Sequence, residues 1–172
     1  MHSAIRTAHG LSGWGKRASL SGMDHNAIDT EPFRVPSGFT PLNWRKGFGL
    51  VMGTLYERDE PNGRFTRAFL VEERHTNGMK NCHGGMLMAF ADMVFGHAMS
   101  LTDRSRHWIT IRLLTDFIAP ARLGDWVEGT SEIVGQDGDL YTTRGRIWVG
   151  ERTVLSGTGV FKFASPRRIA AK

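Results

Sequence analysis

The residues best placed to do chemistry are a single acid, Asp92, and the glycine pair Gly84-Gly85 that follows His83. Asp92 interrupts an otherwise apolar run, Met86–Phe95. A buried carboxylate is costly unless it is paired, hydrogen-bonded or protonated. Asp92 therefore either has a chemical role or lies on a narrow exposed edge of a buried helix, and the spacing of the run alone leaves both readings open.

The His-Gly-Gly turn offers the complementary chemistry, because the first N–H groups of a helix lack intrahelical partners and carry partial positive charge. Gly84 and Gly85 have no Cβ, so a substrate atom can approach the backbone closely. An N–H placed there can stabilise a carbonyl oxygen as it becomes an oxyanion, by about 3 kcal/mol per donor. A tight loop-to-helix turn without a chemical role is the alternative interpretation of this dipeptide.

The spacing of these groups has a consequence for assembly. His83 and Asp92 are nine residues apart, which on a helix is about 900° of rotation and about 13.5 Å of rise. Their side chains therefore leave the helix on opposite sides. A site that uses both the helix start and the acid needs two chains, so the sequence predicts at least a symmetric dimer.

The elements that position these groups follow from hydrophobic periodicity. A helix from about His83 to Leu101 is apolar nearly all round, as a buried helix is. Gly96, Ala98 and Ser100 would let that helix pack closely against a sheet. Strands are predicted before and after it, over residues 48–57, 64–73, 108–118, 125–134, 140–149 and 153–163. Short connections make neighbouring strands antiparallel, and a sheet wrapped around the helix is the simplest way to bury it.

Two details of these strands bear on the site. A turn signal, Asp59–Gly63, joins the first two strands into a hairpin. The strand over residues 108–118 places Ile109, Ile111, Leu113, Thr115 and Phe117 on one face by simple alternation.

Asn77, His83-Gly84-Gly85 and Asp92, at this spacing, resemble the motif of hotdog-fold acyl-CoA thioesterases of the phenylacetate-type (PaaI-like) branch. The resemblance covers the chain from about Gly47 to Phe163 and includes the order of the elements. It implies an α+β hotdog fold, in which an antiparallel sheet of five to six strands wraps around one long central helix.

The resemblance also implies roles for individual residues. Asp92 would be the nucleophile or the general base that activates water, and the Gly84 N–H of the other subunit would polarise the thioester carbonyl. Asn77 would orient the water or the thioester, His83 would help hold the loop and the carbonyl, and Thr110 occupies the place of a Ser or Thr on the next strand. The implied reaction is hydrolysis of an acyl-CoA to a carboxylic acid and CoA, without cofactor or metal, in a homodimer or dimer of dimers with shared active sites.

Some features depart from this motif or suggest other chemistry. Many relatives have Gly three residues before the histidine, where this chain has Lys80. Cys82 beside His83 suggests a Cys–His nucleophile, but adjacent side chains seldom face each other productively and no third orienting group is evident. A non-catalytic acyl-CoA binding or sensing protein on the same fold is the main alternative, and a hotdog dehydratase is a third.

Length and composition fit one domain of 172 residues. We expect the domain to span residues 31–165, between a disordered N-terminal tail (1–30) and a basic C-terminal tail (166–172). Residues 1–22 are included in the native protein only if translation does not start at Met23. The single cysteine, Cys82, fits a reducing, cytoplasmic location.

Composition also argues against several classes of partner. Of the net charge of +5, three charges come from residues 1–22, and the rest of the chain shows no basic stripe of the kind that nucleic acid requires. No apolar run approaches the roughly 20 residues that span a membrane. The histidines His75, His97 and His107 do not form a metal-ligand spacing with acids or Cys82.

Overall fold

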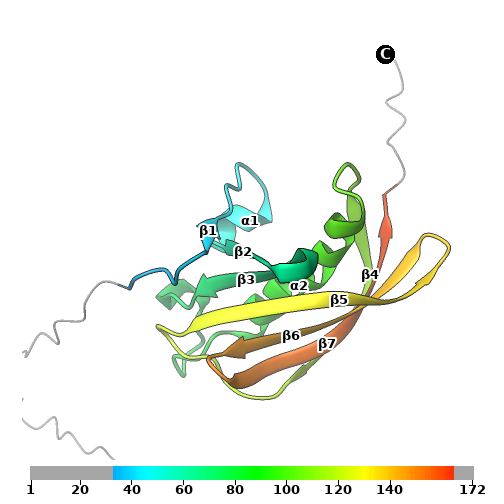
Figure 1. Ribbon diagram of the computed structural model, residues 1–172. Helices are drawn as coiled ribbons and strands as arrows, with labels where there is room; N and C mark the ends of the chain where they lie inside the picture. The colour runs from blue at the N-terminus through cyan, green and yellow to red at the C-terminus, as the bar shows by residue number, and fades with distance from the viewer. Residues whose placement is uncertain (1–32, 165–172) are drawn as a thin grey trace, which may run out of the picture. The chain divides into compact units, whose positions relative to one another are not determined.

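The computed structural model describes residues 33–164, and the predicted tails at 1–30 and 166–172 lie outside this range. The chain divides after residue 34 into two units, of which the second contains all the elements that follow. Within the described residues a single antiparallel sheet has the strand order β1-β2-β3-β5-β6-β7-β4, and it curves around one long helix, α2 (Figure 1). The strands are β1 (Thr40–Pro41), β2 (Tyr56–Glu60), β3 (Arg64–Leu70), β4 (Trp108–Phe117), β5 (Trp126–Asp137), β6 (Leu140–Val149) and β7 (Arg152–Phe163). The helices are α1 (Phe48–Val51), α2 (Gly84–Thr102) and the 3-10 turns η1 (Pro61–Gly63) and η2 (Glu73–His75).

Helix α2 is the centre of the core, as its apolar composition predicts. Phe90, Val94 and Phe95 are fully buried against the concave face of the sheet. A Cβ on Gly96 would come within 2.3 Å of Trp108, so this position must stay small for the helix to sit so close to β4. The predicted hotdog arrangement of one helix inside one sheet is confirmed.

By length and composition alone α2 could cross a membrane, but this is weak evidence because an enclosed core helix passes the same test.

Of the seven strands, β1 is only two residues long, and the other six match the predicted number.

The strand predicted over residues 48–57 is wrong in its first half. Residues Phe48–Val51 form the short helix α1, and the strand begins only at Tyr56. Gly47 and Gly53 on either side of α1 have φ angles of 82° and 81°, which a continuous strand does not allow. None of the α1 residues is buried, so the apolar pattern there does not mark a core face.

The strand order also differs from the prediction that consecutive strands are neighbours. β4 pairs with β7 at one edge of the sheet, and β5 pairs with β3 and β6. β4, which follows α2 in the chain, lies at the far edge of the sheet, and β5 lies in the middle of the sheet beside β3.

The predicted face of β4 is wrong in its first half, where Ile109 and Ile111 are exposed, and right in its second half, where Thr115 bonds to Met88 on α2 and Phe117 lies against Gly84. A bulge between Thr110 and Arg112 breaks the alternation, so Thr110 and Leu113 face the helix side. Ile111 is exposed at 53%. The bulge is what turns Thr110 toward α2, as described below.

Candidate active site

The start of α2 is capped by His83. The His83 backbone is extended, and its Nδ1 atom accepts a hydrogen bond of 2.9 Å from the Gly85 N–H. The His83 carbonyl accepts from the N–H groups of Met86 and Leu87. The Gly84 N–H is different: within residues 33–164 it has no hydrogen-bond partner. Gly84 therefore supplies the free donor of this helix start, and His83 occupies the neighbouring one.

The loop before the helix is held by Asn77. Its side-chain Oδ1 accepts from the N–H groups of Met79, at 2.9 Å, and Asn81, at 3.3 Å. Its own N–H donates to the Asn81 carbonyl at 2.8 Å. Asn77 thus closes the loop on itself as an Asx turn, a role that is visible in this chain beside the one implied by the family motif.

The backbone conformation at Lys80 explains why many relatives have a glycine at this position. Its φ of 58° is the one positive value among the non-glycine residues that the structure describes. This left-handed conformation favours glycine. The loop therefore keeps its left-handed turn in spite of the lysine, whose ammonium group forms an exposed ion pair with Glu73.

A pocket opens at the helix start. Its volume is about 420 Å³, and Asn77, Gly84 and Leu87 line it together with the segment Phe117–Pro120 that follows β4. A Cβ on Gly84 would meet the Phe117 ring at 3.4 Å, an ordinary van der Waals contact. The pocket therefore combines one free N–H with apolar walls, as a site for a carbonyl on an apolar acyl group requires.

The predicted acid lies elsewhere on the helix. Asp92 is half-buried, and its Oδ1 accepts a hydrogen bond of 2.7 Å from the Thr110 hydroxyl. The sequence left open whether Asp92 is enclosed or lies at an edge, and within this chain it lies at a partly exposed edge beside β4. One of its carboxylate oxygens is thereby oriented, and neither Asp92 nor Thr110 lines the pocket that contains Gly84.

The structure thus brings the predicted residues together in two groups. Asn77, His83 and Gly84 form the first group at the helix start, and Asp92 and Thr110 form the second. The separation agrees with the rotation argument from the sequence.

Cys82 is buried in the wall of the same pocket. Burial raises the pKa of its thiol to about 12, and its sulfur contacts the His83 carbonyl rather than the imidazole. A thiol is a weak nucleophile, because the thiolate is the reactive form. The structure therefore counts against the Cys–His reading. Within residues 33–164 no three His, Cys, Asp or Glu side chains are grouped so that they could hold a metal ion.

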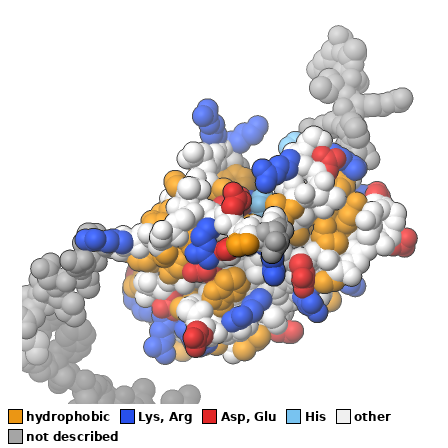
Figure 2. Space-filling model, in the orientation of Figure 1, with side chains coloured by type: hydrophobic (Ala, Val, Ile, Leu, Met, Phe, Trp, Pro, Cys, Tyr) orange, Lys and Arg blue, Asp and Glu red, His pale blue; other side chains and the backbone are white. Residues whose placement is uncertain are grey.

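The surface charge is mixed. Figure 2 shows Lys and Arg side chains interspersed with Asp and Glu over the face that it presents, without a continuous basic area.

One polar cluster was missed at the sequence level. Arg67, Glu57 and His97 bond to one another between the β2–β3 hairpin and α2. The sequence signal was the segment Phe65-Thr-Arg67-Ala-Phe69, in which a charged residue stands between two aromatic residues at alternate positions. Phe65, Arg67 and Phe69 share the inward face of β3, and all three are buried. An arginine on the apolar face of a strand needs buried partners.

Comparison with known proteins decides the family. The chain is 31% identical over 128 residues to a Pseudomonas aeruginosa protein named as an esterase, PA0474, a match that covers 74% of this chain and 96% of that protein. Residues 79–156 match the model of the thioesterase superfamily. This chain belongs to that superfamily. The resemblance to hotdog-fold thioesterases is thereby confirmed.

Two further similarities are to an acyl-coenzyme A thioesterase and to the solved structure of a PaaI protein. Human acyl-coenzyme A thioesterase 13 is 26% identical over 98 residues, which are 57% of this chain and 70% of the human protein. The structure of the PaaI protein from the Escherichia coli phenylacetic acid degradation operon superimposes with a TM-score of 0.61 at 21% identity, over 68% of this thioesterase and 83% of PaaI. The PaaI likeness supports the fold.

Proposed function

We propose that this thioesterase hydrolyses acyl-CoA thioesters to a carboxylic acid and CoA. The observation that carries the proposal is the free Gly84 N–H at the start of α2, which opens into an apolar pocket. A thioester carbonyl bound there gains a hydrogen bond that strengthens as negative charge develops on its oxygen. The relationship to human acyl-coenzyme A thioesterase 13 supports CoA as the thiol.

The Asp92 carboxylate supplies the second half of the reaction. As a general base, it takes a proton from water while the water oxygen attacks the carbonyl carbon; the C–S bond then breaks, and the CoA thiolate takes a proton. As a nucleophile, it attacks first, releases CoA as the thiolate and forms a mixed anhydride that water hydrolyses. Both routes need one free carboxylate oxygen, and the Thr110 bond to Oδ1 leaves Oδ2 available.

The other predicted residues support these two groups. His83 keeps the helix start in place by accepting the Gly85 N–H, so the Gly84 N–H remains the donor for substrate. Asn77 shapes the loop beside the pocket through its side-chain oxygen, and its amide nitrogen, which has no partner within residues 33–164, is available to orient the thioester or the water.

The active site belongs to two chains in this proposal. Gly84 and Asp92 are eight residues apart on one helix, which is about 12 Å of rise, and they lie in separate places on the chain. The edge strand β4 offers a surface for a second copy, because it bonds to β7 on one side only. Large apolar side chains along it are more than two-fifths exposed: Ile109, Ile111, Leu114 and Phe117. A dimer and a dimer of dimers both fit this surface.

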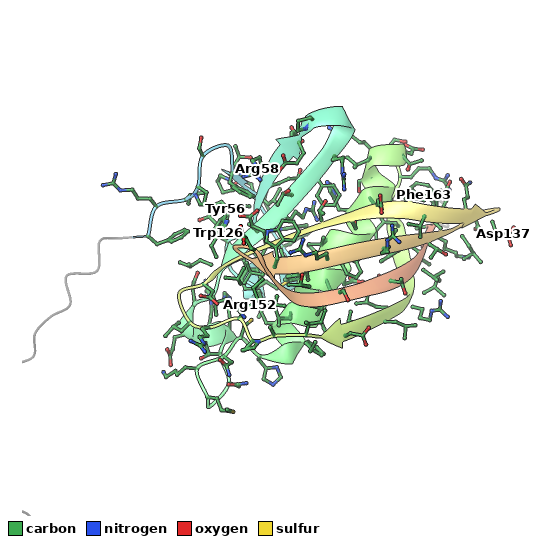
Figure 3. The ribbon with its side chains drawn as sticks, turned by 60° about the horizontal axis from the view of Figure 1, so that its bottom comes forward. Tyr56, Arg58, Trp126, Asp137, Arg152 and Phe163 are labelled. Atoms are coloured by element: carbon green, nitrogen blue, oxygen red, sulfur yellow. The ribbon has the colours of Figure 1, made fainter. Side chains whose placement is uncertain are left out.

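The test is a thiol-release assay with a panel of acyl-CoA substrates. We expect the Asp92→Asn variant to lose at least about 10²-fold in kcat, the scale of a lost acid–base group. The matched control is Asp137→Asn, the same change at the exposed tip of β5, where Figure 3 shows the residue at the end of the sheet. Near-normal turnover by folded Asp92→Asn would refute the mechanism. Binding of acyl-CoA without thiol release by the wild type would favour the non-catalytic alternative.

A further inference from the structure

The buried polar cluster of Arg67, Glu57 and His97 lies on the other side of α2 from Asp92. Arg67 on β3 is only 6% exposed, yet three of its nitrogens donate hydrogen bonds of 2.8 Å. Nε bonds to Glu57 Oε2 on β2, Nη1 to the Met93 carbonyl on α2, and Nη2 to His97 Nδ1 on α2. The register of the hairpin pairs Glu57 directly with Arg67, so both face the helix.

The proton positions in this cluster follow from the donors. Arginine only donates, so His97 Nδ1 must accept, and the ring proton is on Nε2, 3.1 Å from Glu57 Oε2. The pKa of His97 is lowered to about 3, mainly by burial and also by the charges of Arg67 and Arg104, against a smaller raising effect of Asp59.

Both ring nitrogens of His97 are therefore engaged, and the ring stays neutral at ordinary pH. The cluster thus offers a substrate no free ring nitrogen of His97, and its arginine has no acceptor atom. Its hydrogen bonds join β2 and β3 to α2, which suits the cluster to fixing the position of this part of the helix.

The position that it fixes is that of Asp92. Met93 directly follows Asp92, and His97 lies one helical turn beyond Met93. His97 projects about 140° around the helix from Asp92, so Arg67 holds this turn from the β3 side while Thr110 holds Asp92 from the β4 side.

We propose that Arg67 is a positioning residue, which fixes the rotation of the α2 turn that presents Asp92 to the thioester. This inference rests on the proposed role of Asp92. A misplacement of about 1 Å in a reacting group can cost about 10²-fold in rate. Glu57 and His97 contribute to this positioning, because their hydrogen bonds hold the Arg67 guanidinium in one orientation.

The variant Arg67→Lys tests this role. Lysine keeps the charge but cannot bond to Glu57, Met93 and His97 with the planar geometry of arginine. We expect kcat to fall about 10- to 100-fold, with KM within about twofold of wild type and with unchanged circular dichroism and oligomeric state. Arg58→Lys is the matched control: Arg58 bonds to Glu60 and Glu128.

The Arg58 guanidinium also lies over the Phe39 ring, which packs against Trp126, and Figure 3 labels Arg58 and Trp126 toward the same end of the sheet. None of the hydrogen bonds or ion pairs of Arg58 reaches α2 within residues 33–164. We expect its kcat to stay within twofold.

A double-mutant cycle separates positioning from general damage. If Arg67 acts through Asp92, Arg67→Lys slows the wild type but has no further effect on the residual rate of Asp92→Asn. Equal slowing in both backgrounds, or a folded Arg67→Lys with kcat within twofold of wild type, would overturn the proposal. If Arg67→Lys does not fold, Glu57→Gln takes its place in the same cycle, with the same two outcomes. Full activity of Asp92→Asn would instead refute the proposed function, so the two failures are distinguishable.

Discussion

Replacing Gly84 by proline removes the one atom on which the proposed oxyanion stabilisation depends. Proline has no backbone N–H, and the first position of a helix is where it is best tolerated. The preceding residue, His83, has a ψ of 139°, which falls in the range that a residue before proline prefers. Since the Gly84 N–H has no partner within residues 33–164, its loss breaks no hydrogen bond there. We expect the free energy of unfolding to change by less than about 1 kcal/mol.

The effect on catalysis should be much larger than the effect on stability. Loss of one oxyanion donor costs about 10²–10³ in kcat, or about 3–4 kcal/mol. Gly84→Ala is the control, because it adds a methyl group but keeps the N–H. Its Cβ would meet the Phe117 ring at an ordinary 3.4 Å. The assay is steady-state thiol release with protein of verified fold and oligomeric state. A kcat for Gly84→Pro within threefold of that for Gly84→Ala would refute the role of this N–H.

The same variant tests whether active sites are shared. In a heterodimer of one Asp92→Asn chain and one Gly84→Pro chain, shared sites give one site with both groups intact and one site with neither. Such a heterodimer should recover about half of the wild-type activity per dimer. Sites built within one chain would all be damaged, so purified heterodimers without activity would contradict sharing.

Two further predictions concern buried groups. Because the folded pKa of His97 is about 3, below its ordinary 6.5, its contribution to stability is complete above pH 6.5 and is lost at about 1.4 kcal/mol per unit as the pH falls toward 3. In His97→Gln the amide can still bond Arg67 and Glu57. Between pH 7.5 and 5, the free energy of unfolding measured with urea at fixed protein concentration should fall by about 2 kcal/mol less in this variant than in the wild type. An equal fall in both proteins would contradict this. For Cys82, a thiol pKa of about 12 rather than 9 predicts labelling by a disulfide reagent at pH 8 about 10³-fold slower than in the urea-unfolded chain, and comparable rates would show that the thiol is accessible.

The sequence predicts the helix of this thioesterase well and the strands less well, for physical reasons. A 19-residue apolar helix has one stable environment, the inside of a sheet, so its burial follows from composition. The segment Phe48–Val51 has strand-like alternation, but the glycines around it decide its conformation. The partner of β4 is set by contacts distant in sequence, and periodicity carries no information about them.

The site shows the same division between local and distant information. Gly84 and His83 are predictable because a helix start is a local structure with known free donors. The turn of Thr110 toward Asp92 depends on a one-residue bulge, which shifts every later side chain to the other face. Arg67 was missed because its partners are 10 and 30 residues away in sequence, although an arginine between two inward-facing phenylalanines was a signal.

The edge strand β4 links both halves of the proposed site. Thr110, near its start, holds Asp92, and Phe117, at its end, lies against Gly84. When two identical strands pair in antiparallel fashion about a twofold axis, the start of each lies beside the end of the other. A dimer formed through β4 would therefore bring Asp92 of one chain toward Gly84 of its mate at both ends of the paired strands. The separation that prevents one chain from completing its own site is thus the separation that a symmetric pair of edge strands closes.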